Sequence, residues 1–349
     1  MDSFSTAGSP FVPDPFRVDQ RSAIIHGQLQ IDLEAANEFI KRTWHTGLNY
    51  LPCMTGTSRD LQNCSEVYPE SFTTMVVADL LMDQPEHRRT VIGMLAMLEE
   101  ELSPDGLFFF FKEHDRLPAD ADCTALGLSV LLRGGCLVGD RAHLALDRIA
   151  QNTNAEGIVE TYFDPSGERA GIVDPVVCAN VLYLAHQLGR GDEFIPTLNY
   201  LREVLLEGLY LEGTRYYHSP DTFLYFTARV VRRFRQVHDV LLEPLKAAFR
   251  GRQGSTDFPL DLAQRVIIAD ALRMDDMGES QRLLILQERD GCWGADSLFR
   301  YGRKRIFFGS RALMTAFALR ALRATDSSRP VTTPKRTGHG VPFRLRLQP

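Results

Sequence analysis

The chain has 349 residues, of which 44% are hydrophobic and 24% are charged, and its formal net charge is −6. This composition is that of an ordinary globular protein, and the acidic balance excludes a general attraction to nucleic acid or anionic membranes. We expect no secretory signal at the amino terminus and no transmembrane segment, since no apolar run approaches the roughly 18 residues that span a bilayer. The six cysteines lack CxxC spacing, which favours free thiols and a cytoplasmic location.

Helical periodicity dominates the chain, and strand signals are scarce. Six segments are rich in small residues and apolar nearly all round, so they must be covered on every side. In chain order they are residues 68–82, 117–132, 173–188, 219–234, 257–274 and 304–322. Conventionally amphipathic segments alternate with them, at residues 29–44, 87–102, 141–153, 194–208, 238–251 and 280–289.

This alternation predicts an all-α fold, a single (α/α)6 toroid in which an inner ring of parallel helices is wrapped by an outer antiparallel ring. Similar short turns recur along the chain, ending at Gly47, Gly106, Gly157, Gly213 and Gly291. We place the barrel domain at residues 21–325. Residues 1–20 and 326–349, rich in Pro, Ser, Thr and Arg, are expected to form extended arms.

Acidic residues mark the amino-terminal ends of the predicted inner helices, which would ring one mouth of the barrel. They are Glu70, Asp120, Asp122, Asp174, Asp221, Asp257 and Asp261. Helix capping explains one acid per helix, because Asp is among the best N-caps. It explains the pair Asp120 and Asp122 less well. Two close carboxylates beside the apolar run 108–111 resist losing both protons, so Asp122, the deeper one, is predicted to be a general acid. Asp120 would orient Asp122 or share its proton.

Two short stretches resemble the class II terpene cyclases. QERDGCWG (287–294) is similar to the QW repeat of squalene–hopene cyclases, with Gln287, Gly291 and Trp293 in the matching places. DADCTA (120–125) resembles the DxDDTA motif of that family. The resemblance implies that Asp122 is the proton donor and that the reaction is the acid-initiated cyclisation of an isoprenoid. This chain departs from the family pattern at Cys123, which replaces the last Asp of the motif. It also differs in size, since members of the family usually carry two toroids and this chain has room for one.

A single toroid also resembles the β subunit of protein prenyltransferases, whose zinc ligands begin with an Asp-x-Cys pair. At the predicted mouth Asp122 and Cys123 are adjacent, without an intervening residue, so no metal is expected there. No other cofactor is expected either, except that Mg²⁺ could accompany a diphosphate substrate.

Aromatic residues cluster around the predicted mouth, where their faces would stabilise a carbocation without attacking it. Tyr162, Phe163, Tyr216 and Tyr217 lie in loops that lead into inner helices. The predicted aromatic lining is Phe72, Phe108, Tyr162, Phe163, Tyr217, Phe223, Tyr225 and Phe308. Three polar residues stand inside apolar helices, namely Asn180, Arg229 and Arg311. Each either has a buried partner or lines the cavity, with the arginines ready for a diphosphate or carboxylate.

Three functions remain open on the sequence. The favoured one is a terpene cyclase-like cyclase, isomerase or lyase of secondary metabolism, acting on a small hydrophobic isoprenoid as a monomer or homodimer. The second is a glycoside hydrolase or lyase, which predicts an open cleft with Trp or Tyr platforms and acids from two helices. The third is a non-catalytic toroid that binds a prenyl chain or a partner protein.

Overall fold

The computed structural model describes residues 22–45, 50–64, 66–112 and 116–325. Within them the helices are α1 (Ser22–His45), α2 (Phe72–Leu81), α3 (Arg88–Glu101), α4 (Ala121–Arg133), α5 (Gly139–Gln151), α6 (Pro175–Gln187), α7 (Ile195–Leu206), α8 (Pro220–Arg233), α9 (Arg235–Arg252), α10 (Pro259–Leu272), α11 (Glu279–Ile285) and α12 (Arg311–Thr325). The strands are β1 (Cys53–Gly56), β2 (Glu66–Tyr68), β3 (Ser297–Arg300) and β4 (Phe307–Gly309). Short 3₁₀ helices cover Pro85–His87 (η1) and Gly191–Phe194 (η2).

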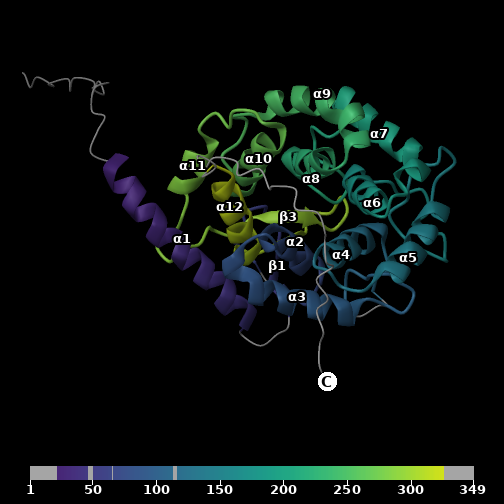
Figure 1. The fold of residues 1–349 in the computed structure, drawn as a ribbon, viewed down its shortest axis with the longest axis horizontal. Helices are drawn as coiled ribbons and strands as arrows, with labels where there is room; N and C mark the ends of the chain where they lie inside the picture. Colours follow the sequence, from purple (N-terminus) through teal and green to yellow (C-terminus); the bar gives the residue numbers. More distant parts are fainter. Residues whose placement is uncertain (1–21, 46–49, 65, 113–115, 326–349) are drawn as a thin grey trace, which may run out of the picture.

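The even-numbered helices form a closed inner ring (Figure 1). Each packs against the next, from α2 through α4, α6, α8 and α10 to α12, and α12 returns to α2. The odd-numbered helices α3, α5, α7, α9 and α11 pack outside their inner partners, and α1 packs against α12. The predicted (α/α)6 toroid is confirmed.

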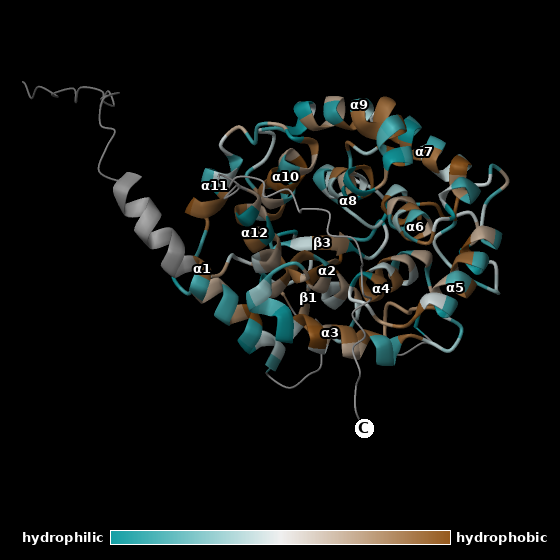
Figure 2. Ribbon diagram, in the orientation of Figure 1, coloured by the Kyte–Doolittle hydropathy of each residue, from teal (hydrophilic) through white to brown (hydrophobic). Residues whose placement is uncertain are grey.

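Burial separates the two rings, as the sequence pattern requires. In α4 every residue from Ala121 to Leu131 is buried, because neighbours surround the helix. In α5 the buried residues are Ala142, Ala145, Leu146 and Ile149, the i, i+3, i+4, i+7 stripe of a surface helix. In Figure 2 the inner helix α4 is largely brown, whereas the outer helix α5 carries both teal and brown.

A four-stranded antiparallel sheet, in the order β2-β1-β4-β3, was not predicted. Phe308 of β4 pairs with Thr55 of β1 on one side and with Phe299 of β3 on the other. Figure 1 shows β3 across the centre of the ring. The prediction that residues 304–310 begin a helix is wrong, since α12 starts at Arg311. Strands of three or four residues are too short to show a period of two in the sequence.

The recurring glycine turns are positions where a side chain does not fit. Gly106 and Gly291 have φ angles of +79° and +84°. A Cβ atom on Gly106 would overlap the carbonyl oxygen of Arg141, and one on Gly291 would overlap Ala35. The turn at Gly291 is closed by Gln287, whose Nε2 donates to the Gly291 carbonyl at 2.8 Å. Gly47 lies outside the described residues.

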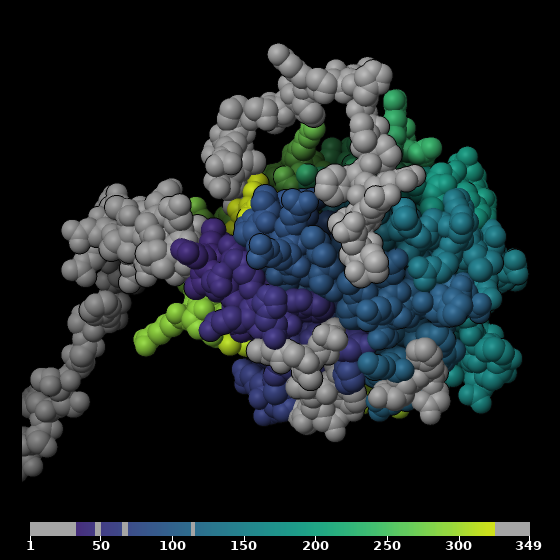
Figure 3. Space-filling model, turned by 60° about the horizontal axis from the view of Figure 1, so that its bottom comes forward, coloured from purple at the N-terminus to yellow at the C-terminus, as the bar shows by residue number. Residues whose placement is uncertain are grey.

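The described part of α1 lies on the outside of the molecule (Figure 3, purple), where it packs against α12. Its Asn37 Oδ1 lies 2.7 Å from Nε2 of His87, at the end of η1. The expected arms at residues 1–20 and 326–349 lie outside the described residues. Within the described ranges, every helix is too short or too polar to cross a bilayer.

Candidate active site

A cavity lies at the amino-terminal end of the inner ring, between α2, α4 and the sheet. It holds about 530 Å³ of empty space, counting the part open to solvent. The residues in its wall come from helix starts, loops and the β3–β4 hairpin. They are Phe72, Phe110, Leu117, Asp120, Asp122, Cys123, Thr161, Tyr162, Tyr216, Tyr217, Phe299, Arg300, Tyr301 and Phe308.

Asp122 is buried in the first turn of α4, and both of its carboxyl oxygens accept hydrogen bonds. Asn180 Nδ2, from α6, donates to Oδ1 at 2.8 Å. The Tyr217 hydroxyl, from the loop before α8, donates to Oδ2. The Asn180 amide is itself held in this orientation, because its Oδ1 accepts from Arg229 Nη1 at 3.1 Å. Two neutral donors therefore face Asp122, and no guanidinium pairs with it among the described residues.

This environment raises the pKa of Asp122 to about 7, first because burial penalises the charged form and second because Asp120 is close. The hydrogen bonds from Tyr217 and Asn180 oppose the rise without cancelling it. Burial also raises the pKa of Asp120, to about 6. Asp122 is therefore the carboxyl group of this pair that holds a proton at higher pH.

Asp120 has a second role that Asp122 lacks. It is the N-cap of α4, where its Oδ1 accepts from the backbone N–H of Cys123 at 2.7 Å. Cys123 is buried, and burial raises the pKa of its thiol well above the usual range. At the place where the resembling motif has a third carboxylate, this chain therefore has a neutral group.

The cavity wall opposite the acids is aromatic. The Phe72 ring meets the Phe299 ring edge to face, with 5.5 Å between centroids. Phe299 stacks on Phe308 at 5.3 Å, and Phe110 packs edge-on against Phe299 at 5.5 Å. Tyr162 and Tyr216 form a further edge-to-face pair at 6.0 Å. The β3–β4 hairpin thus supplies much of the apolar wall above α2 and α4.

The other acids predicted at this mouth have structural partners. Asp174 caps α6 by accepting from the Val176 N–H at 2.9 Å, and Glu70 accepts from the Thr73 N–H at 2.9 Å. Asp257 is exposed and pairs with Arg282.

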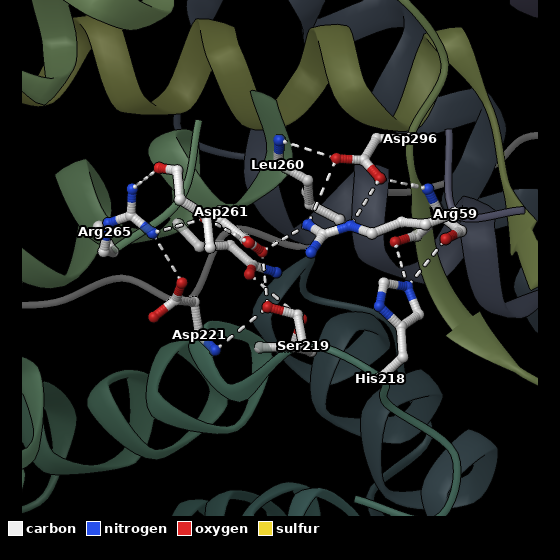
Figure 4. A network of polar contacts seen from close by, with 12 residues as sticks. Arg59, His218, Ser219, Asp221, Leu260, Asp261, Arg265 and Asp296 are labelled. Atoms are coloured by element: carbon white, nitrogen blue, oxygen red, sulfur yellow. Dashed lines mark hydrogen bonds and ion pairs between the residues drawn. The ribbon is translucent and has the colours of Figure 1, made fainter. Parts of the chain in front are cut away.

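Asp221 and Asp261 belong to a buried ionic network (Figure 4). Arg59 Nη2 lies 2.6 Å from Asp261, and Arg59 Nε lies 3.2 Å from Asp296. Arg265 pairs with Asp221 and Glu279, both at 2.7 Å. Of the seven acids, Asp122 alone is neither paired with a cation nor bound to a backbone N–H among the described residues.

Several residues predicted to line the cavity lie elsewhere. Phe108 is buried against Gly127 of α4, and Phe223 packs on Tyr210 with 5.4 Å between centroids. Phe163 is half-buried against the core, and its N–H donates to the Ala119 carbonyl at 3.0 Å. Arg311 pairs with Glu288 and Asp290 outside the cavity.

Tyr225 and Arg229 line a hollow at the opposite end of the ring. They lie about one and a half and two and a half turns below the start of α8, so they are too deep to reach the mouth. Asn180 stands behind Asp122 and holds it, without entering the cavity wall. Of the predicted set, Asp120, Asp122, Phe72, Tyr162, Tyr217 and Phe308 lie in the wall.

The predicted set leaves out wall residues whose aromatic cluster was visible in the sequence, namely Phe110, Tyr216, Phe299 and Tyr301. It also leaves out Leu117, Cys123, Thr161 and Arg300. Arg300 Nη2 donates to the Thr214 carbonyl at 2.6 Å, which ties the hairpin to the loop that carries Tyr217. Phe308 was predicted at the mouth as part of a helix, whereas it lies there in strand β4.

Comparison with known proteins places this geometry in context. Residues 45–188 match the family described as the sesquiterpene cyclase astC-like C-terminal domain. The drimenol cyclase drtB of Aspergillus calidoustus is 34% identical over 214 residues, which cover 60% of this chain and 38% of that protein. The match thus spans well under two thirds of the length of that relative.

Solved structures share the fold at low sequence identity. Type II terpene cyclase MstE from Scytonema has a TM-score of 0.65 and 16% identity, over 85% of this chain and 97% of that one. A variant of MstE in complex with geranylgeranyl dihydroxybenzoate, its substrate, has a TM-score of 0.64 and 15% identity, over 85% and 97% of the two chains. ent-Copalyl diphosphate synthase from Streptomyces platensis has a TM-score of 0.54 and 16% identity, over 74% and 50%. The predicted resemblance is therefore confirmed, in sequence to a sesquiterpene cyclase family and a drimenol cyclase over part of the chain, and in fold to type II terpene cyclases over most of it.

Proposed function

We propose that the chain cyclises a linear isoprenoid by protonating it, with Asp122 as the acid. One observation carries the proposal. A buried carboxyl group, whose pKa is raised to about 7, faces an aromatic cavity and has no cationic partner among the described residues. A general acid works best when its pKa lies near the operating pH, so that it is protonated and still able to release the proton.

In the proposed step the O–H bond of Asp122 breaks and its proton forms a C–H bond at one carbon of a substrate double bond. The electron pair of that double bond makes the new C–H bond, and the neighbouring carbon becomes a cation. Further double bonds of the same chain attack the cation and close the rings. Loss of a proton to a base, or capture of water, ends the sequence, and solvent returns a proton to Asp122.

The two groups that donate hydrogen bonds to Asp122 stabilise the carboxylate that forms when Asp122 gives up its proton. Tyr217 and Asn180 stabilise the charged form, so they make proton release easier without holding the acid ionised beforehand. Asn180 is fixed by Arg229, which keeps its amide N–H group toward Asp122. These are positioning residues, and Asp122 is the proposed catalytic residue.

The aromatic wall is suited to stabilising a carbocation as the positive charge moves along the substrate. Phe72, Phe299 and Phe308 line the cavity, and each contact of a cation with the face of such a ring contributes roughly 0.5–2 kcal/mol. Asp120 is the nearest other carboxyl group, and its bond to the Cys123 N–H holds it at the helix end.

We favour a sesquiterpene precursor as the substrate, because the matched family is described as sesquiterpene cyclases and the matched relative as a drimenol cyclase. The glycoside hydrolase alternative needs two carboxyl groups on opposite sides of the scissile bond. Asp120 and Asp122 instead share one turn of α4, and Trp293 is fully buried. The proposed proton transfer uses the Asp122 carboxyl group itself and asks for no cofactor. The free thiols of all six cysteines favour a reducing, cytoplasmic setting.

The test is an assay of cyclic products from farnesol, geranylgeraniol and the diphosphates of both. Wild type is compared with Asp122→Asn and with the matched control Asp140→Asn, an exposed acid in the first turn of α5. We expect wild type and the control to give the same cyclic product, and Asp122→Asn to be slower by about 10²–10⁴-fold.

Cyclic products at the wild-type rate from Asp122→Asn would eliminate the proposed donor. A wild-type protein that binds these substrates and returns them unchanged would instead favour the non-catalytic toroid.

A further inference from the structure

The inner ring has a second hollow, at the end opposite the proposed acid. It holds about 1470 Å³ of empty space, counting the part open to solvent. All six inner helices contribute to its wall from their carboxy-terminal halves. Five arginines stand in this wall, and they are Arg133, Arg229, Arg232, Arg233 and Arg320. A hydrophobic cavity at one end of the barrel is thus matched by a strongly cationic one at the other.

The positive charge in this hollow exceeds the negative charge. Asp79 pairs with Arg229 at 2.8 Å and also with Arg133, which reaches Asp83 at 3.1 Å. Asp270 pairs with Arg232 at 2.5 Å and with Arg320 at 3.8 Å. Arg233 is exposed and forms no ion pair within the described part of the chain. Five guanidinium groups therefore meet three carboxylates.

Helix ends offer one ordinary explanation for such arginines, because the carboxy-terminal end of a helix carries partial negative charge. Hydrogen bonding shows that they do more than cap. Of the five, only Arg133 reaches a helix carbonyl in the described residues, that of Asp79 at 3.5 Å. Arg232 donates to one carboxylate, and Arg233 donates to no described group, so both keep N–H groups for a ligand.

We propose that this hollow, defined by the five arginines, is a binding site for a diphosphate group. Guanidinium forks bind phosphate oxygens in pairs, and several forks from different helices around one space suit a ligand with several charged oxygens. Arginines from α4, α8 and α12 meet here, so the site exists only in the closed ring. The site is separate from the proposed substrate cavity, and it does not depend on the proposed reaction.

One arginine connects the two ends of the barrel. Arg229 lines the hollow, pairs with Asp79 there and donates to Asn180, whose amide donates to Asp122. A change at Arg229 would disturb both sites. Arg232 and Arg233, which touch neither Asn180 nor Asp122, are therefore the residues to alter.

The experiment is calorimetric titration of the full chain with inorganic pyrophosphate. Wild type is compared with R232A/R233A and with R88A/R89A, a control that removes the same charge from two exposed arginines of α3. We expect saturable binding to wild type and to the control, and at least tenfold weaker binding to R232A/R233A. Circular dichroism melting checks that both variants fold. Equal binding by R232A/R233A, or an equal loss in the control, would overturn the proposal.

Two further ligands define the chemistry. Citrate carries several carboxylates, and if it binds as tightly as pyrophosphate the phosphate class is wrong. Farnesyl diphosphate, titrated into Asp122→Asn with and without R232A/R233A, distinguishes the source of the group. Its binding weakens in the arginine variant if the site takes a prenyl diphosphate head group, and stays unchanged if the site takes the free anion. Either of these two results is compatible with the site, since the pyrophosphate titration decides whether it exists.

Discussion

Two acids at the same end of the barrel, Asp122 and Asp261, have different hydrogen-bonding and ionic partners. Asp122, at the start of α4, is held by an amide and a phenol and faces an aromatic cavity. Asp261, at the start of α10, is held by Arg59 and by the hydroxyl of Ser219 at 2.5 Å. Both are buried, and both lie in the first turn of an inner helix.

The difference in partners decides what each acid can do. Burial raises the pKa of Asp122 to about 7, and only neutral donors oppose the rise. Burial is the largest single influence on Asp261 too, but the Arg59 charge and the hydrogen bonds from Arg59, Ser219 and Thr256 together outweigh it and hold the pKa of Asp261 below its ordinary value. Asp261, with the Arg59 guanidinium beside it, remains ionised and stabilises the fold. Asp122, which has no guanidinium partner among the described residues, keeps its proton for chemistry.

The largest expected effect is on the stability of the protein, through the buried ionic network that contains Asp221 and Asp261. Arg265→Met leaves Asp221 and Glu279 buried without their shared cation. Breaking a buried pair in this way costs about 3–5 kcal/mol of unfolding free energy. Urea unfolding measures the loss, with Arg311→Met as the control, because its pairs are half exposed and contribute roughly 0–1 kcal/mol. A loss below 1 kcal/mol for Arg265→Met would show that the network is not structural.

On the acid side, Tyr217→Phe removes one donor while keeping the ring in the cavity wall. The carboxylate formed by proton transfer loses a hydrogen bond, so we expect cyclisation to slow by about 10–100-fold and the pKa of Asp122 to rise. Product assays over a range of pH measure both changes. Tyr210→Phe, at a buried tyrosine that packs on Phe223 and does not line the cavity, should leave both unchanged. Equal rates for the two variants would argue against the positioning role.

A smaller effect is expected from Asp120→Asn. Asn caps helices as well as Asp, so unfolding free energy should change by less than about 0.5 kcal/mol. Loss of the Asp120 charge removes one cause of the raised pKa of Asp122, which should then fall below about 7. The rate depends on the protonated acid, so the pH at which it declines should move downward, with less than about a tenfold loss at pH 7. A loss as large as that of Asp122→Asn would make Asp120 the donor.

The two rings were predictable because helical periodicity is a local property. Residues within one segment, such as 121–133, reveal by their composition whether a helix is covered on all sides. The pair Asp120 and Asp122 was also predictable, since both stand in one short motif. The sequence could not show which of the acids has a cationic partner. Arg59 and Asp261 are about two hundred residues apart in the chain, and Arg59 follows β1, a strand of the unpredicted sheet.

The most direct test is the titration of Asp122 itself. Carbon-13 NMR of aspartate-labelled protein, with Asp122→Asn to assign the resonance, gives its pKa in the folded chain. The structure predicts an inflection near pH 7 for Asp122 in the wild type. It also predicts that activity declines as pH rises through that value, because the acid must be protonated to act. A carboxyl group that titrates near pH 4, as exposed aspartate does, would contradict the account.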